Sequence, residues 1–155
     1  MRLIIQRVLS AGVKVDGEFI SQIGPGICIL LGLHKGDSLK HVDKWAEKVL
    51  KLKLWPQQDK NNINLQKNEE IEQKQESRQA GGWKSSVLDN NFEVLIVSNF
   101  TLYGVLKGNK PDFHDSMKAD EAKNIYEYFI KKMQNIYKPE KIKGGKFSTL
   151  YECPY

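Results

Sequence analysis

The sequence predicts an α+β fold in which a curled, barrel-like and mainly antiparallel sheet carries two main helices. Short apolar runs bounded by turn residues indicate strands, and two longer segments repeat their apolar residues at the helical period of 3.6. The chain has 155 residues, of which 40% are hydrophobic and 28% charged. That size and composition fit one compact domain over residues 1–155.

Strands dominate the N-terminal part. Residues 1–8 are the first apolar run, and residues 12–23 predict a hairpin around Asp16-Gly17, a dipeptide typical of tight hairpin turns. After a Gly-Pro-Gly break, residues 27–33 form a continuous apolar run. Such a run indicates a strand buried on both faces.

The first helix is expected after Asp37 or Ser38, either of which can cap it. Its apolar face consists of six residues at helical spacing: Leu39, Val42, Trp45, Ala46, Val49 and Leu50. Leucines then alternate with lysines over residues 50–55 and lead into Pro56. This alternation predicts a strand with one solvated face.

Residues 57–82 are rich in Gln, Asn, Glu and Lys and contain almost no large apolar side chain. Such a segment buries too little surface to offset the entropy of ordering it, so we expect an exposed, mobile insertion within one domain. The core resumes with a strand over residues 92–97. A second helix over residues 120–137 has the apolar face Ala122, Ile125, Tyr126, Phe129, Ile130, Met133 and Tyr137.

The composition favours a cytoplasmic protein. Neither Cys28 nor Cys153 belongs to a CxxC pair, which suits a reducing compartment. Cys28 lies in an apolar run and is most simply a small core residue. The first ten residues include Arg2 and Arg7, unlike a signal peptide. No apolar run approaches the length of a membrane span, so no membrane partner is expected.

The net charge of +5 is concentrated in one stretch. Between residues 131 and 146 there is one acid and six lysines: Lys131, Lys132, Lys138, Lys141, Lys143 and Lys146. A local basic stripe is typical of nucleic-acid-binding surfaces. The alternative is a solvated helix face followed by a loop.

Polar residues at the end of the 92–97 strand suggest a site for an ester or a carbonyl group. The stretch Ser98 to Leu102 follows that strand, and Gly108 to His114 continues it. Successive backbone N–H groups there could point at a carbonyl oxygen, and one such donor stabilises a developing oxyanion by about 3 kcal/mol. An ordinary strand end with a Ser/Asn turn is the alternative.

No metal or cofactor is expected. Thr101 is the nearest candidate nucleophile, but no His or acid adjoins it in the sequence to activate it. His34, His41 and His114 lack metal-ligand spacing. The chain has no Walker-type phosphate loop, no GxGxxG and no GxSxG motif.

Several short motifs, in this order, resemble the D-aminoacyl-tRNA (D-tyrosyl-tRNA) deacylases, eukaryotic type. They are Met1-Arg2 through Gln6-Arg7-Val8, the apolar run Gly26 to Gly32, Leu52-Lys53-Leu54-Trp55, Ser98-Asn99-Phe100-Thr101-Leu102, and Lys107 to His114. The fourth is similar to the family's Ser-Gln-Phe-Thr-Leu signature. The resemblance covers residues 1 to about 147 apart from the insertion.

The resemblance implies a homodimer that hydrolyses the ester between a D-amino acid and the terminal adenosine of tRNA, as proofreading in translation. It implies catalysis by backbone groups and the ribose hydroxyl of the RNA, without a metal or another cofactor. Ser98 and Asn99 would flank the scissile carbonyl, and Phe100 and Thr101 would shape the pocket. The implied substrate-binding residues are Arg7, Pro111, Asp112, Phe113, Gly145, Lys146 and Phe147, the last three near the adenosine.

The chain departs from the family in two places. Asn99 replaces the signature Gln and is shorter by about 1.5 Å, which withdraws a side-chain contact but leaves the backbone donors. The family also has a C-terminal Gly-Pro element with a cis bond, which enters the partner subunit's pocket and excludes L-amino acids. Residues 148–155 lack it, and Cys153-Pro154 does not replace it, because a Cβ fills the space that glycine leaves open.

Since the family's Arg at the position of Arg7 holds the Gly-Pro element, Arg7 is expected to lack that partner. We therefore expect a deacylase of reduced activity or reduced chiral selectivity. A tRNA- or nucleic-acid-binding homologue without turnover is the second interpretation. An editing domain for a different aminoacyl ester is the third.

Overall fold

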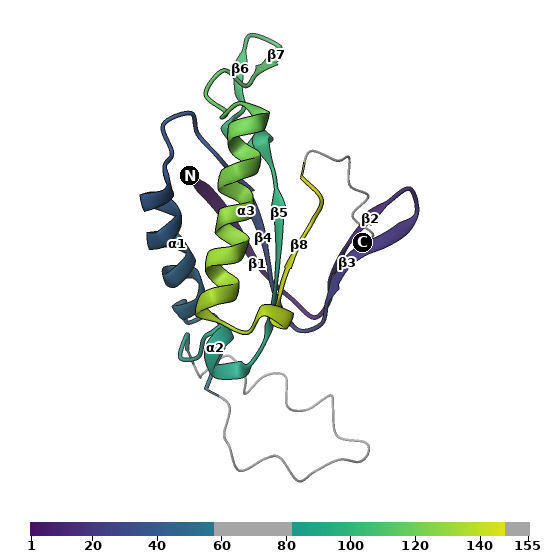
Figure 1. The fold of residues 1–155 in the computed structure, drawn as a ribbon, viewed down its shortest axis with the longest axis vertical. Coiled ribbons are helices and arrows are strands. Elements are labelled where there is room, and N and C mark those ends of the chain that lie inside the picture. The colour runs from purple at the N-terminus through teal and green to yellow at the C-terminus, as the bar shows by residue number, and fades with distance from the viewer. Residues whose placement is uncertain (58–81, 148–155) are drawn as a thin grey trace.

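The computed structural model describes residues 1–57 and 82–147 (Figure 1). The predicted insertion over residues 57–82 therefore lies outside the described residues, except for its two end positions. The divergent segment 148–155 also lies outside them.

A four-stranded sheet forms the centre of the fold (Figure 1). Its strands, in spatial order, are β1 (Arg2–Val8), β4 (Gly26–Gly32), β5 (Glu93–Ser98) and β8 (Ile142–Gly144). β1 is antiparallel to β4, whereas the β4–β5 and β5–β8 pairs are parallel. The three strands predicted over residues 1–8, 27–33 and 92–97 are thus confirmed.

The prediction of a mainly antiparallel sheet is wrong for this central sheet. A long helix lies between β4 and β5, and another between β5 and β8. Each helix carries the chain back to the end of the sheet where the preceding strand began, so the next strand runs parallel to that strand. The described strands form an open sheet with β1 and β8 at its edges, not a closed barrel. The α+β class is confirmed.

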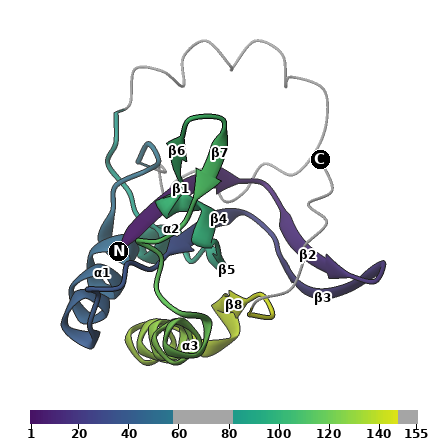
Figure 2. The same cartoon turned by 90° about the horizontal axis from the view of Figure 1, so that it is seen from above.

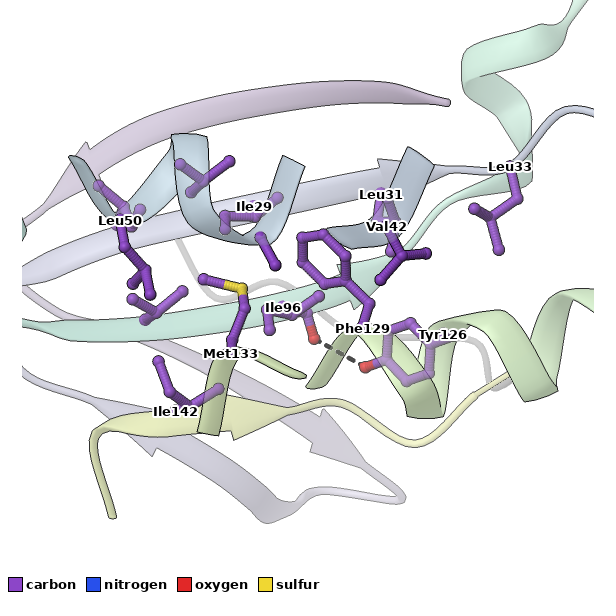
Figure 3. Close-up of a cluster of buried hydrophobic side chains, with 14 of the residues drawn as sticks. Ile29, Leu31, Leu33, Val42, Leu50, Ile96, Tyr126, Phe129, Met133 and Ile142 are labelled. Carbon is purple, nitrogen blue, oxygen red and sulfur yellow. Dashed lines mark hydrogen bonds between the residues drawn. The ribbon is translucent and has the colours of Figure 1, made fainter. Parts of the chain in front are cut away.

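The two predicted long helices, α1 (Leu39–Lys51) and α3 (Ala119–Ile136), are also confirmed. Both lie on the same face of the sheet (Figure 2). Their apolar stripes meet that face in one core, where Ile29, Val42 and Phe129 have no exposed surface (Figure 3). A short helix, α2 (Val87–Asn90), precedes β5. No helix in the described part of the chain is both long and apolar enough to cross a membrane.

The strand predicted over residues 50–55 is not formed. The helix α1 continues to Lys51 because Val49 and Leu50 are both fully buried on its inner face. Leu52 and Leu54 are half-buried, while Lys51 and Lys53 are exposed, as the alternation predicts. No neighbouring strand pairs with this stretch among the described residues, and its only ladder contact is an isolated bridge between Trp55 and Ser85.

A hairpin covers part of the opposite face of the sheet (Figure 2). It consists of β2 (Ala11–Val15) and β3 (Glu18–Ile23), as predicted. The turn residues Asp16 and Gly17 have φ of 53° and 82°, the left-handed backbone that this hairpin turn requires. Val13 and Ile23 pack on Leu95 and Val97 there. Cys28 packs beside this smaller core but is only half-buried.

A second hairpin projects beyond the sheet at the end where β5 finishes (Figure 1). It is formed by β6 (Val105–Lys107) and β7 (Lys110–Asp112), and a 3₁₀ turn, η3 (Phe100–Tyr103), connects it to β5. Another 3₁₀ turn, η4 (Pro139–Lys141), connects α3 to β8.

Candidate active site at one end of the sheet

The parallel pairing brings three chain segments to one end of the sheet. Because β4, β5 and β8 run in the same direction, the residues that follow them meet at their carboxyl ends. These residues are Leu33-His34, Asn99 to Thr101, and Gly145 to Phe147. The carboxyl ends of parallel strands are where open α/β sheets bind ligands. The topology thus assembles most of the predicted site residues, although they are distant in the sequence.

The turn after β5 is held by Asn99. Its N–H donates to the Leu31 carbonyl at 2.8 Å, which extends the ladder by one residue. Its Oδ1 accepts hydrogen bonds from the Thr101 N–H at 3.0 Å and the Thr101 hydroxyl at 2.5 Å. A side-chain oxygen in this position is the usual cap of a helical turn. Asn99 therefore points back into its own turn, at the place where the signature has the longer Gln.

Thr101 is not activated as a nucleophile in this arrangement. Its hydroxyl donates to an amide oxygen, which is not a base. An activated hydroxyl needs a His, an amine or a carboxylate as the acceptor of its proton. Among the described residues, the Thr101 hydroxyl thus has an amide oxygen and not a base as its hydrogen-bond partner.

The Phe100 N–H is a backbone donor that the described residues leave unused. It is the first N–H of η3, and the first N–H groups of a helical turn have no partner within the turn. Among the described residues, no hydrogen bond to it is formed. It lies beside Ser98 and Asn99, where the sequence predicts an oxyanion donor.

The ring of Phe100 is 60% exposed and is supported from one side. Phe113 meets it edge to face, with ring centroids 5.0 Å apart. Phe113 in turn lies against the backbone of Gly104, where a Cβ would come within 2.8 Å of the Phe113 ring. The Ser116 hydroxyl donates to the Phe100 carbonyl at 3.0 Å. The predicted residues Phe100 and Phe113 are therefore neighbours, and Pro111 lies exposed on β7 beyond them.

Asp112 is a structural anion rather than a proton carrier. It forms an ion pair with Lys107 and accepts hydrogen bonds from the N–H and the Nδ1 of His114, each at 2.9 Å. Lys107, followed by these two donors of His114, holds the pKa of Asp112 far below its usual value. A carboxylate whose pKa is held so low is a weak base, and at neutral pH it has no proton to donate as an acid.

Gly145, Lys146 and Phe147 lie beside the end of β5. The Gly145 N–H donates to the Ile96 carbonyl at 2.9 Å. Phe147 packs on the ring of Tyr126, and Lys146 is exposed. The segment is thus held beside β5, two residues before the Ser98–Thr101 turn begins.

Arg7 does not join this group within one chain. Its register partner on β4 is Ile27, which pairs with Val94 on β5. Val94 is four residues before Ser98, a separation of about 13 Å along the strand. The Arg7 guanidinium donates to the Leu54 carbonyl at 2.8 Å and lies 5.7 Å from the centre of the Trp83 ring.

Arg2 and Tyr103 are residues at the site that the sequence did not reveal. Arg2 donates to the Leu102 carbonyl at 2.7 Å and lies over the Tyr103 ring at 4.5 Å. Burial of Tyr103, and secondarily the charge of Asp37, raise the pKa of its hydroxyl. The antiparallel register places Arg2 opposite Gly32, at the carboxyl end of β4. The hydrophobic pattern of the sequence does not define that register, so the sequence does not predict that Arg2 lies at the site.

The basic stretch at residues 131–146 is not a single free surface. Three of its lysines make contacts within the chain: Lys132 with Asp43 at 3.0 Å, Lys138 with Asn91 at 2.9 Å, and Lys141 with Glu93 at 3.6 Å. Lys143 and Lys146 lie on β8 and just after it, on the side of the candidate site. No group of three His, Cys, Asp or Glu side chains suited to a metal ion occurs within residues 1–57 and 82–147.

Comparison with known proteins defines the class. The sequence profile of the family described as D-Tyr-tRNA(Tyr) deacylase matches residues 4–73 and 68–153. The chain is 41% identical over 149 residues to the D-aminoacyl-tRNA deacylase of Drosophila melanogaster, covering 96% of this chain and 81% of that one. It is 40% identical to the enzyme of the same name from Schizosaccharomyces pombe, covering 97% and 87%. The chain belongs to the D-aminoacyl-tRNA deacylase family.

The human D-aminoacyl-tRNA deacylase 1 is 40% identical over 149 residues, and the chain spans 62% of the length of that relative. Among solved structures, the c-Myc DNA unwinding element binding protein superposes with a TM-score of 0.81 at 38% identity, covering 99% of this chain and 89% of that one. A probable eukaryotic D-amino acid tRNA deacylase superposes with a TM-score of 0.73 at 12% identity, which shows the shared fold.

Proposed function

We propose that the chain hydrolyses the ester bond of D-aminoacyl-tRNA. Water adds its oxygen to the carbonyl carbon, and the bond to the ribose oxygen breaks. One proton of the water passes to that oxygen, so the products are the free D-amino acid and tRNA. Membership of the family supports the reaction, and the geometry at the end of the sheet supports the place where it occurs.

The observation that carries the proposal is the unused Phe100 N–H beside the strand end. It belongs to a turn that Asn99 fixes before any substrate arrives. A preorganised donor stabilises the oxyanion that forms when water attacks, typically by about 3 kcal/mol. Because the Thr101 hydroxyl donates to the Asn99 amide oxygen and to no base among residues 1–57 and 82–147, the proposed mechanism uses the Phe100 N–H and the ribose hydroxyl of the substrate, without a covalent intermediate.

The other predicted residues take binding roles in this proposal. Ser98 and Asn99 flank the scissile carbonyl, while Gly145, Lys146 and Phe147 contact the terminal adenosine. The exposed ring of Phe100, supported by Phe113, forms a wall of the pocket. Pro111 and the ionised Asp112 lie at the entrance to this pocket. Asp112 also fixes the end of the β6–β7 hairpin through its contacts with Lys107 and His114.

We also propose that residues 1–155 act as one domain in a cytoplasmic homodimer. Apolar side chains on the face opposite the helices support a partner there: Ile4 is 50% exposed, Phe19 49% and Ile20 44%. A second copy on this face would complete the barrel-like closure of the sheet. Arg7 is three residues after Ile4 on β1 and therefore points to the helix face, where it donates to the Leu54 carbonyl. A partner on the Ile4 face does not by itself support the proposed role of Arg7 in binding.

The test is hydrolysis of D-tyrosyl-tRNA and L-tyrosyl-tRNA by this chain and by a version with the family's final Gly-Pro strand grafted after Phe147. Hydrolysis of the D-ester is the expected result. Hydrolysis of the L-ester by the native chain, abolished by the graft, would assign chiral selection to the grafted element. Hydrolysis of neither ester by either version would overturn the proposal.

A nucleic-acid-binding role without turnover is the second candidate. The name of the c-Myc DNA unwinding element binding protein, which shares 38% of its sequence with this chain, favours it. Phosphate contacts release counterions, so such binding falls steeply with salt. Tight, salt-dependent binding of uncharged tRNA or duplex DNA, with no ester hydrolysis, would place this candidate first.

A further inference from the structure

Tyr126 on α3 contacts both β5, which precedes the Ser98–Thr101 turn, and the Gly145–Phe147 segment. It lies on the inner face of α3 and is 2% exposed. Its hydroxyl lies 2.8 Å from the Ile96 carbonyl oxygen (Figure 3) and 2.9 Å from the Gly145 carbonyl oxygen. One hydroxyl hydrogen thus serves two acceptors, one on β5 and one just after β8, in a three-centre arrangement.

Two further contacts fix the Gly145–Phe147 segment at the same point. The Gly145 N–H donates to Ile96, and the ring of Phe147 packs on the Tyr126 ring with centroids 5.6 Å apart. At Gly144 a Cβ would come within 2.5 Å of the Ile130 side chain and 3.3 Å of the Tyr126 hydroxyl. Only a glycine lets β8 approach α3 this closely.

The position of Ile96 makes this contact relevant to the substrate. Ile96 is two residues before Ser98, so the hydroxyl connects the strand that carries the Ser98–Thr101 turn to the segment proposed to contact the adenosine. We infer that Tyr126 is a positioning residue that sets the spacing between the ester-binding turn and the adenosine-binding segment. This inference rests on the proposed function. A buried hydroxyl lost to Phe leaves both carbonyls without this donor.

Tyr137, the C-cap residue of the same helix, provides a matched control. Its hydroxyl also donates to a backbone carbonyl of the β5 region, that of Phe92, at 3.1 Å. Phe92 lies just before the start of β5, at the end of the sheet away from the site. Tyr137→Phe therefore removes the same chemical group without touching the proposed site.

The experiment compares the native chain, Tyr126→Phe and Tyr137→Phe in three measurements. They are the KM and kcat for D-tyrosyl-tRNA, the Kd for uncharged tRNA, and amide hydrogen exchange over residues 142–147. For Tyr126→Phe we expect about a fivefold rise in KM and in Kd, about 1 kcal/mol, with kcat within about twofold of native. Exchange at Gly145 should accelerate. Tyr137→Phe should match the native chain in all three.

The outcomes separate this inference from the proposed function. A native chain that binds tRNA without hydrolysing it, with binding weakened by Tyr126→Phe alone, would refute the hydrolysis and support the positioning role. If Tyr126→Phe leaves KM, Kd and exchange unchanged, or if Tyr137→Phe changes them equally, the positioning role is refuted. A fall in kcat with no change in KM or Kd also refutes it, because the adenosine contact then does not depend on Tyr126.

Discussion

Asn99 and Thr101 together form a turn that is fixed by hydrogen bonds and contains no catalytic base. The Asn99 amide oxygen accepts both the N–H and the hydroxyl of Thr101, so the turn is rigid but contains no base. The oxygen of the amide must face Thr101, because the N–H there requires an acceptor. Rigid donors without an activated nucleophile suit direct attack by water on an ester.

Thr101→Val tests whether that hydroxyl takes part in the chemistry. Valine keeps the shape of threonine and removes only the hydroxyl, so we expect turnover of D-tyrosyl-tRNA within about threefold of the native rate. Loss of a true nucleophile typically lowers kcat by about 10⁴-fold or more. Single-turnover hydrolysis is the measurement, and a loss of that size would make Thr101 the nucleophile. Thr101→Ser, which keeps the hydroxyl, is the control for the substitution itself.

Among single residues, the sequence revealed those whose chemistry is local. The sequence predicts a site at Ser98 to Thr101 because polar residues end an apolar strand there. It also predicts a turn at Asp16-Gly17, which the structure confirms with left-handed backbone. Arg2 was not found, since its place at the site depends on the register between β1 and β4. Arg7, predicted for the site, lies towards the other end of the same strand.

At the scale of elements, the close approach of β4 and β5 depends on one glycine. A Cβ on Gly26 would lie 1.9 Å from the backbone oxygen of Glu93, which cannot move without breaking the strand pair. Gly24, two residues earlier, has only the flexible Glu93 carboxylate within reach, at 3.4 Å.

The two glycines therefore give a matched pair of variants. We expect Gly26→Ala to lower the free energy of unfolding by about 3 kcal/mol or to prevent folding, because overpacking against backbone leaves no relaxed position. Gly24→Ala should lower the free energy of unfolding by less than about 1 kcal/mol. Urea denaturation followed by circular dichroism measures both, and equal losses would contradict the assigned contact.

The helix α2 is anchored by a carboxylate whose effect depends on pH. Lys53 donates to Asp89 at 2.7 Å, and the N–H and hydroxyl of Ser86 each donate at 2.8 Å. Lys53, followed by Ser86, lowers the pKa of Asp89 from 3.8 to about 2. A carboxyl with a lowered pKa stabilises the fold above its ordinary pKa, and that contribution is lost as the pH falls through the folded value.

Asp89→Asn should therefore lower stability at neutral pH. The difference from the native chain should shrink between pH 3.8 and about pH 2, where Asp89 becomes protonated. Urea midpoints across this range measure the effect. Asp16→Asn is the control, because Asn also adopts the left-handed backbone of that turn. A difference that persists unchanged at the lowest pH would contradict the role assigned to the charge.

The prediction of elements succeeded where apolar residues repeat over several turns and failed where the pattern was short. Both long helices and the three long strands were predicted from periodicity. The 50–55 stretch has the alternation of a strand, but a strand also needs a partner, and within the described part of the chain only Ser85 pairs with it. Alternation reports burial on one side and does not report hydrogen-bond partners.

At the scale of the whole molecule, one face of the sheet is only partly covered. The hairpin β2–β3 covers Leu95 and Val97, while Ile4, opposite Leu30 in the register, is 50% exposed. Exposed apolar area on a sheet face is typical of an interface between copies. The order of parallel strands that creates this face could not be predicted, because it depends on which strands the helical connections bring together.

The variant Ile4→Glu tests the proposed dimer. A charge in the centre of an apolar interface is left without a partner, so we expect this variant to be monomeric where the native chain is dimeric. Leu106→Glu, at an equally apolar and more exposed position on the β6–β7 hairpin, is the control and should remain dimeric. Sedimentation equilibrium distinguishes the states, and a native chain that is monomeric at all concentrations would refute the dimer.

The bridge between Trp55 and Ser85 implies that the backbone need not be unbroken for the protein to stay folded. The two residues pair through hydrogen bonds of 3.1 and 2.9 Å between their backbones, so the parts of the chain described before residue 58 and after residue 81 end side by side. Each part of the chain on either side contributes strands to the same sheet. A protein cut once between residues 58 and 81 should therefore remain a complex of two fragments. Two fragments expressed from separate genes are then expected to associate and reconstitute the folded protein.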